Sequence, residues 1–490
     1  MDTIWLLTVL GMPLIAVLVL VTLRSRLVTR PRAAGWIAGV AAALSLIGTL
    51  TLIPGLRAGI VTSVTMRWIP AAGIQFGLHL DALSLPFLIT EAAVTLVAIL
   101  YSWGYHHIDD RTPYYYALLM LFAVGMAGTT IADDMFLFYI FWELMLVASC
   151  VLIAMWGEGE RRTAVALKYF IFTHLGSLLV LVALILLYDA AGNDGFAALR
   201  AGISLAPGLT RTAIALFLIG FCVKMAVFPL HLWLPDAHTV APMSVTIMLA
   251  AAMLSMGTYG ILRFPMGTFS QAQMAPFGLP MKIMGVVSEM YGALMALAER
   301  DVKRIIAYSS VSQMGYILYG LGTLTRQGVS GAMLHVIYHA IVKALLFMCT
   351  GLIIRATGRR TISELRGLGK AMPLAAVATG AGVLAIAGTP PLGIFDSEWM
   401  IFAGGFQTPY LWLAVLAVLG SLLTVAYALW FWVRIFVGQQ PDDVEVRDIP
   451  HAMAIPSVVL SVLALVAGIL PGPIFGWAES ALSLIWGGAW

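Results

Sequence analysis

Apolar runs of about 20 residues, separated by short polar loops, recur along the whole sequence. A helix rises about 1.5 Å per residue, so a run of this length crosses a hydrocarbon core roughly 30 Å thick. Lipid offers no hydrogen bonds to the backbone, whereas a helix satisfies its own. The sequence therefore predicts an all-α polytopic membrane protein with about fourteen transmembrane helices. The predicted spans are 2–23, 33–55, 79–103, 114–131, 134–155, 163–190, 210–230, 241–264, 280–298, 303–325, 330–355, 372–401, 409–437 and 452–487.

Composition supports this class and excludes others. Hydrophobic residues make up 61% of the 490 residues and charged residues only 10%, whereas about a quarter of a soluble domain is charged. The net charge of +3 is too small and too dispersed for a nucleic-acid surface. Cys150, Cys222 and Cys349 each lie alone in an apolar run, without the C-x-x-C spacing of metal, cluster or haem sites. We therefore expect no cofactor, no metal centre and no nucleic-acid partner.

The distribution of basic residues predicts the orientation. Loops and helix ends on one side of the predicted bundle hold 17 Lys and Arg residues, and those on the other side hold 7, among them Arg200 and Arg211. Cytoplasmic loops carry the excess of basic residues. Because the first apolar run lacks a preceding basic segment, it is expected to be an uncleaved helix, and both termini are expected outside.

Two of the predicted helices contain prolines at comparable places. The seventh span is interrupted at VFPL (227–230), and the twelfth at GTPPLG (388–393). Proline removes a backbone hydrogen bond and clashes with the preceding turn, which lipid tolerates only beside protein or a polar cavity. Broken helices five apart indicate two structural repeats around an ion path, as in transporters. Two unrelated proline breaks are the alternative.

Lys224 and Glu143 are ionisable residues deep inside apolar runs. A charge near the bilayer centre costs at least about 2.5–3.5 kcal/mol, so such residues face a polar interior and usually serve a function. Glu143 is the expected partner of Lys224. The alternative is a static ion pair that only fixes helix packing.

A second group consists of His335, His339 and Lys343, spaced four residues apart in HVIYHAIVK. This spacing places all three on one helix face, where they would form a row able to relay protons. The alternatives are two histidines bonded to neighbouring carbonyls, or a haem site, which would need facing histidines on separate helices.

Other ionisable or polar residues lie near these groups. Lys168 either joins the same path or extends its side chain to the membrane surface, and His231 and His238 either join it or only satisfy the first helix break. Ser309, Ser310, Ser312 and Gln313 either hold water or only bond to neighbouring helices. The remaining candidates are His174 in the sixth span and Glu398 just after the second break.

The chain resembles the antiporter-like membrane subunits of respiratory complex I, and in length and general pattern it is similar to the M-type subunit. The motifs that carry the resemblance are LDALSLPF from Leu80, ADDMFLFYIFWELML from Ala132, KMAVFPLHLWLPDAH from Lys224, AERDVKRIIAYSSVSQMGY from Ala298 and GTPPLGIFDSEW from Gly388. Two stretches within them, FWELML and FPLHLWLPDAH, are highly specific.

The resemblance implies a fourteen-helix fold with two inverted five-helix repeats, each forming half of a proton channel. The expected division is an N-terminal three-helix segment (1–112), a first repeat (113–265), a second repeat (266–437) and a C-terminal helix (438–490). It also implies that Glu143 and Lys224 form the family's glutamate–lysine pair and that Glu398 is its exit carboxylate.

The chain departs from the M-type pattern in its eighth span. M-type subunits usually have a lysine before the M-G-x-Y-G stretch, where this sequence reads AAMLSMGTYG with Ser255. Lys343 is the candidate replacement. HAIVKALLF and SSVSQMG resemble L-type subunits and Mrp antiporters instead, and GTPPLGIFDSEW resembles membrane-bound hydrogenases.

The hypothesis is a proton-translocating, non-redox subunit of an NADH:quinone oxidoreductase-type complex in a bacterial or archaeal cytoplasmic membrane. Its expected partners are other membrane subunits, the lipid bilayer and protons, with sodium or potassium as the alternative ions. The rival functions are an Mrp-type cation/proton antiporter, the corresponding subunit of a membrane-bound hydrogenase or inorganic-carbon-uptake complex, and a purely structural role.

Overall fold

A computed structural model describes residues 2–69, 74–105, 109–191, 195–196, 199 and 205–486. In this part of the chain, twelve helical segments are long and apolar enough to cross a membrane. They are α1 (Asp2–Thr22), α3 (Pro31–Thr51) with α4 (Ile53–Arg57), α5 (Ser84–Tyr105), α6 (Thr112–Ile131), α7 (Met135–Trp156), α8 (Arg162–Ala191), α10 (Pro207–Met225), the segment Met243–Thr268, α15 (Gln271–Ala298), α17 (Arg326–Thr357), α20 (Leu411–Phe436) and α21 (His451–Ile469). The segment Met243–Thr268 contains α12 (Met243–Met248), the π-helix η2 (Leu249–Met253), α13 (Ser255–Arg263) and α14 (Pro265–Thr268).

Two further crossings complete the bundle. One is α16 (Val302–Gly322), whose mean hydropathy is lowered by a serine-rich stretch although nearly the whole helix is buried. The other is a broken helix made of α18 (Pro373–Ile386) and α19 (Gly393–Phe406). With these two, the described chain has the fourteen crossings that the sequence predicts, and the protein is a polytopic membrane protein.

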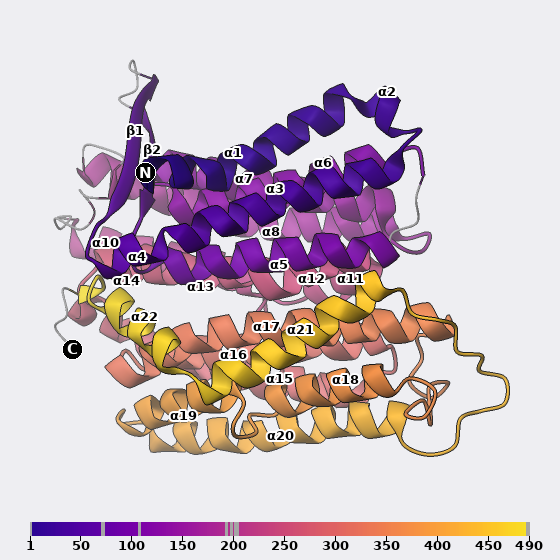
Figure 1. The fold of residues 1–490 in the computed structure, drawn as a ribbon. Helices are drawn as coiled ribbons and strands as arrows, with labels where there is room; N and C mark the ends of the chain where they lie inside the picture. The colour runs from indigo at the N-terminus through magenta and orange to yellow at the C-terminus, as the bar shows by residue number, and fades with distance from the viewer. Residues whose placement is uncertain are drawn as a thin grey trace.

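The helices lie side by side in two stacked groups (Figure 1). The chain up to α14 forms one group and α15 to α20 form the other, while α21 and the short α22 (Gly472–Leu482) run across the boundary. Contacts of α21 with α5, α17 and α18 join the two groups. The start of α1 and the end of α22 lie at one end of the bundle, and α2 (Arg24–Leu27) and α11 (Leu234–Val240) lie at the opposite end.

Local sequence explains where the central helices begin and how closely they pack. Asp134 accepts hydrogen bonds from the backbone of the first turn of α7, and Asp301 does the same for α16, so both helices start at capping residues. Gly285, Gly292 and Gly315 bring the backbones of α15 and α16 together, because a side chain at any of them would collide with the facing helix.

The prediction of a single last span, 452–487, is wrong. The helix α21 ends at Ile469, and α22 begins only at Gly472. Pro471 explains the division, since proline cannot donate the backbone hydrogen bond that would continue α21.

Other differences concern boundaries and one additional element. A two-stranded antiparallel hairpin, β1 (Thr62–Ile69) and β2 (Ile74–Leu80), occupies the connection before α5, so the third crossing begins at Ser84 rather than at 79. The ninth crossing begins at Gln271 rather than at 280. Arg200, one of the seven basic residues on the predicted outer side, lies outside the described residues.

A buried ion pair ties α5 to α13. The Arg263 guanidinium donates to both carboxylate oxygens of Asp81, at 2.7 and 2.8 Å, and also to the Ser84 hydroxyl at 2.8 Å. Both charged side chains are almost completely buried. The pair therefore fixes the end of the segment Met243–Thr268 against the start of the third crossing.

We predict that Asp81→Asn lowers the free energy of unfolding by about 3 kcal/mol, because it leaves the Arg263 cation buried without a counter-charge. The double variant Asp81→Asn/Arg263→Met should recover much of this loss. Thermal unfolding in detergent, followed by tryptophan fluorescence, measures both effects. The exposed Asp442→Asn is the control, and equal stability of Asp81→Asn and Asp442→Asn would contradict the prediction.

Candidate functional site

Lys224 lies at the first helix break. It is in the last turn of α10, is 2% exposed, and its Nζ has no hydrogen-bond partner in the described part of the chain. The Nζ lies 5.1 Å from the centroid of the Trp142 ring, within cation–π range. Carbonyl groups at a helix C-terminus favour a cation, so the break itself provides part of the environment for this amine.

The chain around the first break satisfies part of its own backbone. Ala226 adopts a left-handed conformation with φ of 54°, which ends α10 at Met225, one residue after Lys224. The Trp233 indole then donates to the Val223 carbonyl at 3.0 Å. The break is therefore an ordered interruption, as the proline in VFPL predicts.

Glu143 contacts two residues of α8 rather than Lys224. Its Oε2 lies 3.1 Å from His174 Nδ1, and its other oxygen accepts a hydrogen bond from the Ser177 hydroxyl. Lys224 is still within electrostatic range of Glu143. Among the described residues, the two charges thus influence one another without a direct hydrogen bond.

His231 and His238 follow the first break and are buried. The His231 ring lies against Phe228 and Tyr291, and the His238 ring stacks on Phe347 of α17 with centroids 5.2 Å apart. In the described residues, the ring nitrogens of both histidines have no hydrogen-bond partner. These side chains therefore do not satisfy the broken backbone, and both leave two nitrogens available to water.

His335, His339 and Lys343 form a row on α17, and all three are fully buried. The rings of His335 and His339 have centroids 6.5 Å apart. Lys343 Nζ donates to the Ile306 carbonyl at 3.1 Å and to the Ser309 hydroxyl. The His238 ring stacks on Phe347, one turn from Lys343 on α17, so this row lies beside the chain that follows the first break.

Polar partners hold one end of this row but not its middle. The His335 ring nitrogens lie 2.9 Å from Gln313 Oε1 and 3.0 Å from Ser397 Oγ. The His339 ring nitrogens have no partner in the described chain. The row therefore contains a fixed ring beside an unpartnered one, both inside the bundle.

Two buried carboxyl groups lie beyond His335. Glu398 is on α19, and its Oε1 has no hydrogen-bond partner in the described chain. Glu289 on α15 is fully buried, and neither of its oxygens has one. Tyr316 stacks on His335 with centroids 5.6 Å apart and is within electrostatic range of both carboxyl groups.

Glu289 is a further candidate residue, absent from those predicted from the sequence. It is the only acidic residue in the predicted span 280–298. A lone acid within an apolar run is the same signal that singled out Glu143. Gly420 of α20 makes room for it, since a Cβ there would collide with the carboxyl group.

A cleft of about 700 Å³ lies two helical turns from Glu289 along α15. Lys282 lines the cleft, and its amine donates to the Thr408 hydroxyl at 3.1 Å. The same amine lies 4.7 Å from the centroid of the Tyr410 ring. The cleft therefore brings a basic side chain of α15 to an opening close to the buried carboxyl groups.

Lys168 and Ser255 lie outside this series of buried groups. Lys168 donates to Asp236 at 2.7 Å, and its side chain is 42% exposed. Ser255 is buried at the start of α13, and its hydroxyl donates to the Ala251 carbonyl of η2. No charge replaces the missing lysine at this position, but η2 packs against α17, the helix of Lys343.

Comparison with known proteins identifies the family. The model of the NADH:quinone oxidoreductase/Mrp antiporter transmembrane family matches residues 132–424, and that of the complex I chain 5 N-terminus matches residues 68–116. The chain therefore belongs to the family of antiporter-like membrane subunits of complex I-type NADH:quinone oxidoreductases and Mrp antiporters. The resemblance noted in the sequence is thus confirmed.

Individual relatives support this family assignment. An NAD(P)H-quinone oxidoreductase chain 4 of Synechococcus sp. is 35% identical over 78% of this chain and 73% of its own. F(420)H(2) dehydrogenase subunit M of Methanosarcina mazei is 34% identical over 84% of each chain. A chain of Thermus thermophilus respiratory complex I superposes with a TM-score of 0.86 at 26% identity, covering 98% of this chain and 99% of that one. A chain of the Dietzia sp. Mrp complex, 24% identical, shares the fold with a TM-score of 0.88 over 100% and 98%.

We predict that Glu289→Gln lowers proton translocation by the assembled complex on the order of tenfold, because an amide cannot bind and release a proton at this position. Proton uptake into inverted membrane vesicles, normalised to the amount of assembled complex, measures the effect. Glu289→Asp should keep more activity than Glu289→Gln. The matched control is Glu299→Gln, which changes the acidic residue just after α15 that forms an ion pair with Arg304. Equal proton uptake in Glu289→Gln and in this control would show that Glu289 does not take part in proton transport.

Proposed function

We propose that this chain translocates protons through a hydrated interior pathway, as a non-redox subunit of a complex I-type assembly. The observation that carries the proposal is the set of buried ionisable groups between the two helix breaks. In order, the pathway consists of Glu143, Lys224, His238, Lys343, His339, His335 and the carboxyl groups Glu289 and Glu398. His174 and His231 border its first half.

Unpartnered polar atoms support a water-filled pathway. Lys224, His238 and His339 all have side-chain nitrogens without a hydrogen-bond partner in the described residues. Buried polar groups in proteins are almost always hydrogen-bonded, to ordered water where no protein group serves. Water beside these nitrogens would also join stations that lie too far apart for direct transfer.

Electrostatic coupling between neighbouring charges would pass a change of protonation along the pathway. A unit charge about 8 Å away, at an effective dielectric constant of about 20, acts with about 2 kcal/mol. Moving one charge through 100 mV requires about 2.3 kcal/mol. A single pair such as Glu143 and Lys224 therefore supplies slightly less than this energy, so several linked stations are needed. Protonation changes at Glu143 would alter Lys224 and pass along α17 to Glu289 and Glu398.

Lys343 takes the place of the central lysine that is absent at Ser255. Its helix contacts η2, the turn that precedes Ser255, and its amine is fully buried. Lys343 also interacts electrostatically with His238, which follows the first break, whereas Lys224 precedes it. The amine can thus receive a proton from the first half and pass it to His339.

The partly exposed pair Glu143 and His174 supports a membrane partner. Their side chains are 21% and 35% exposed on the surface of this chain, in the middle of predicted spans. Ionisable groups within the membrane rarely face lipid. Another membrane subunit would cover this surface and transmit to Glu143 the effect of electron transfer elsewhere in the assembly.

The proposed placement is a bacterial or archaeal cytoplasmic membrane with both termini outside. The excess of basic residues at the end of the bundle that holds α2 supports it. We propose the division into 1–112, 113–265, 266–437 and 438–490, with one broken helix in each of the two repeats. With both termini outside, the Lys282 cleft opens on the outer side of the membrane.

The transported ion and parent complex define the rival functions. An Mrp-type antiporter would exchange sodium or potassium for protons in vesicles without any electron donor. A nickel-iron subunit or a carbonic-anhydrase-like subunit among the co-purified chains would indicate a hydrogenase or an inorganic-carbon-uptake complex. Purification of the native assembly and identification of its companion chains distinguishes these from a quinone oxidoreductase.

We predict that Lys224→Ala and Glu143→Gln each remove most donor-driven proton uptake, on the order of tenfold or more, while the complex still assembles. Uptake into inverted vesicles reports transport, and native electrophoresis reports assembly. The exposed loop residue Lys370 offers a matched control, Lys370→Ala. Unchanged proton uptake in either pathway variant would refute the proposed mechanism. Reduced assembly, with normal uptake for each complex that does assemble, would support a purely structural role.

A further inference from the structure

Glu91 is a buried acid outside the pathway described above. It lies within α5, in the N-terminal group of helices, and is 2% exposed. The Thr130 hydroxyl of α6 donates to its Oε1 at 2.6 Å, whereas its Oε2 has no hydrogen-bond partner in the described chain. An ionised carboxylate is very unfavourable in such surroundings without a counter-charge. The geometry therefore favours the neutral acid.

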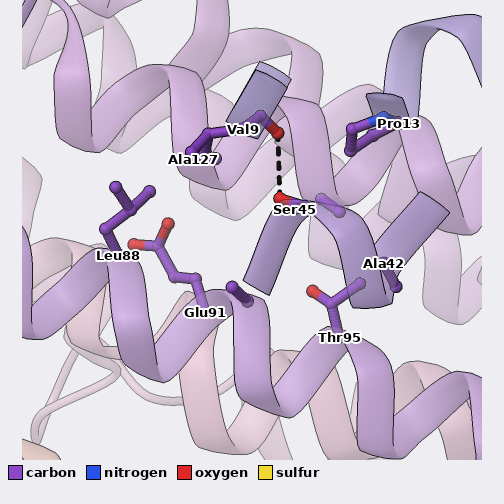
Figure 2. A pocket seen from close by; sticks show the side chains of 10 residues that line it. Val9, Pro13, Ala42, Ser45, Leu88, Glu91, Thr95 and Ala127 are labelled. Carbon is purple, nitrogen blue, oxygen red and sulfur yellow. Dashed lines mark hydrogen bonds between the residues drawn. The ribbon is translucent and has the colours of Figure 1, made fainter. Parts of the chain in front are cut away.

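The Glu91 side chain points into a small cavity between α1, α3, α5 and α6 (Figure 2). The cavity leaves about 10 Å³ for the centre of a water molecule, which is close to the space that one water requires. Besides Glu91, the polar side chains lining it are Ser45 and Thr95. The cavity therefore has room for about one water molecule beside the Glu91 side chain, with two hydroxyl-bearing residues in its wall.

A proline in α1 explains one hydrogen bond in the wall of the cavity. Pro13 interrupts the hydrogen bonding of α1, because it has no N–H to donate to the Val9 carbonyl one turn earlier. The Ser45 hydroxyl of α3 donates to that carbonyl instead, at 2.9 Å (Figure 2). The polar lining thus rests on a specific exchange of hydrogen bonds between two helices.

Thr130 connects this site to the segment that contains Ser255. Its hydroxyl lies 3.7 Å from the Met256 sulfur, and its carbonyl accepts a hydrogen bond from the Tyr259 hydroxyl at 2.7 Å. The Tyr259 oxygen in turn accepts from Arg263 at 3.0 Å. A change in the charge of Glu91 would therefore act first on Thr130 and, through it, on α13.

We propose that Glu91 is a proton-binding site, at which the carboxyl group exchanges its proton with a water molecule in the cavity. Thr130 holds the acid in place and transmits its protonation state to α13. This site is separate from the proposed pathway: it lies on α5 and would bind its proton whether or not Lys224 conducts.

Infrared difference spectroscopy of the assembled complex in lipid, recorded between acid and alkaline pH, tests the proposal. We expect a carbonyl-stretch band from the neutral acid that titrates with pH, is lost in Glu91→Gln and remains in the exposed control Glu364→Gln. Thr130→Val should shift this band to higher frequency, because it removes the hydrogen bond to Oε1. The band should persist in Lys224→Ala, which separates this test from that of the pathway.

Three outcomes would overturn the proposal. A spectrum of Glu91→Gln identical to that of the natural sequence would show that Glu91 contributes no titrating acid. A Glu91 band that does not respond to pH would indicate a permanently protonated structural group. Loss of the band on addition of sodium at constant pH would identify a metal-cation site instead.

Discussion

The cost of placing ionisable groups in a membrane governs this structure. Each such group needs a polar partner, and the bundle provides several kinds. Asp81 and Arg263 pair with each other at the end of the bundle. Lys224 lies at the C-terminus of a broken helix, and Lys343 bonds to a carbonyl and a hydroxyl of α16. The chain thus keeps charges inside the bundle by a direct ion pair, by a helix break and by polar groups of a neighbouring helix.

The two halves of the proposed pathway differ in their surroundings. In the first half, Glu143 and its partner His174 are partly exposed, so protonation there is open to influence from a neighbouring subunit. In the second half, Glu289 and Glu398 are buried, within electrostatic range of one another. This asymmetry is consistent with a signal that enters at one surface and a proton that leaves from the interior of the bundle.

Features that depend on local sequence could be predicted, and those that depend on tertiary contacts could not. Span length, proline breaks and the row on α17 follow from helix geometry, because spacing of four residues places His335 and Lys343 on one face. The contact of Glu143 with α8, rather than with Lys224, depends on how helices rotate against one another. Glu289 and Glu91 required only the same signal as Glu143, but their significance emerges from the cavities and carboxyl groups around them.

In the proposed mechanism, water joins these buried groups into one corridor. A high-resolution electron cryo-microscopy structure of the native assembly in lipid nanodiscs, with ordered water resolved, would show whether this water is present. We expect water density from the Lys224 amine past His238 to Lys343, and from His339 on to Glu289. Tightly packed apolar side chains without water between Lys224 and Lys343, or lipid against these groups, would contradict it.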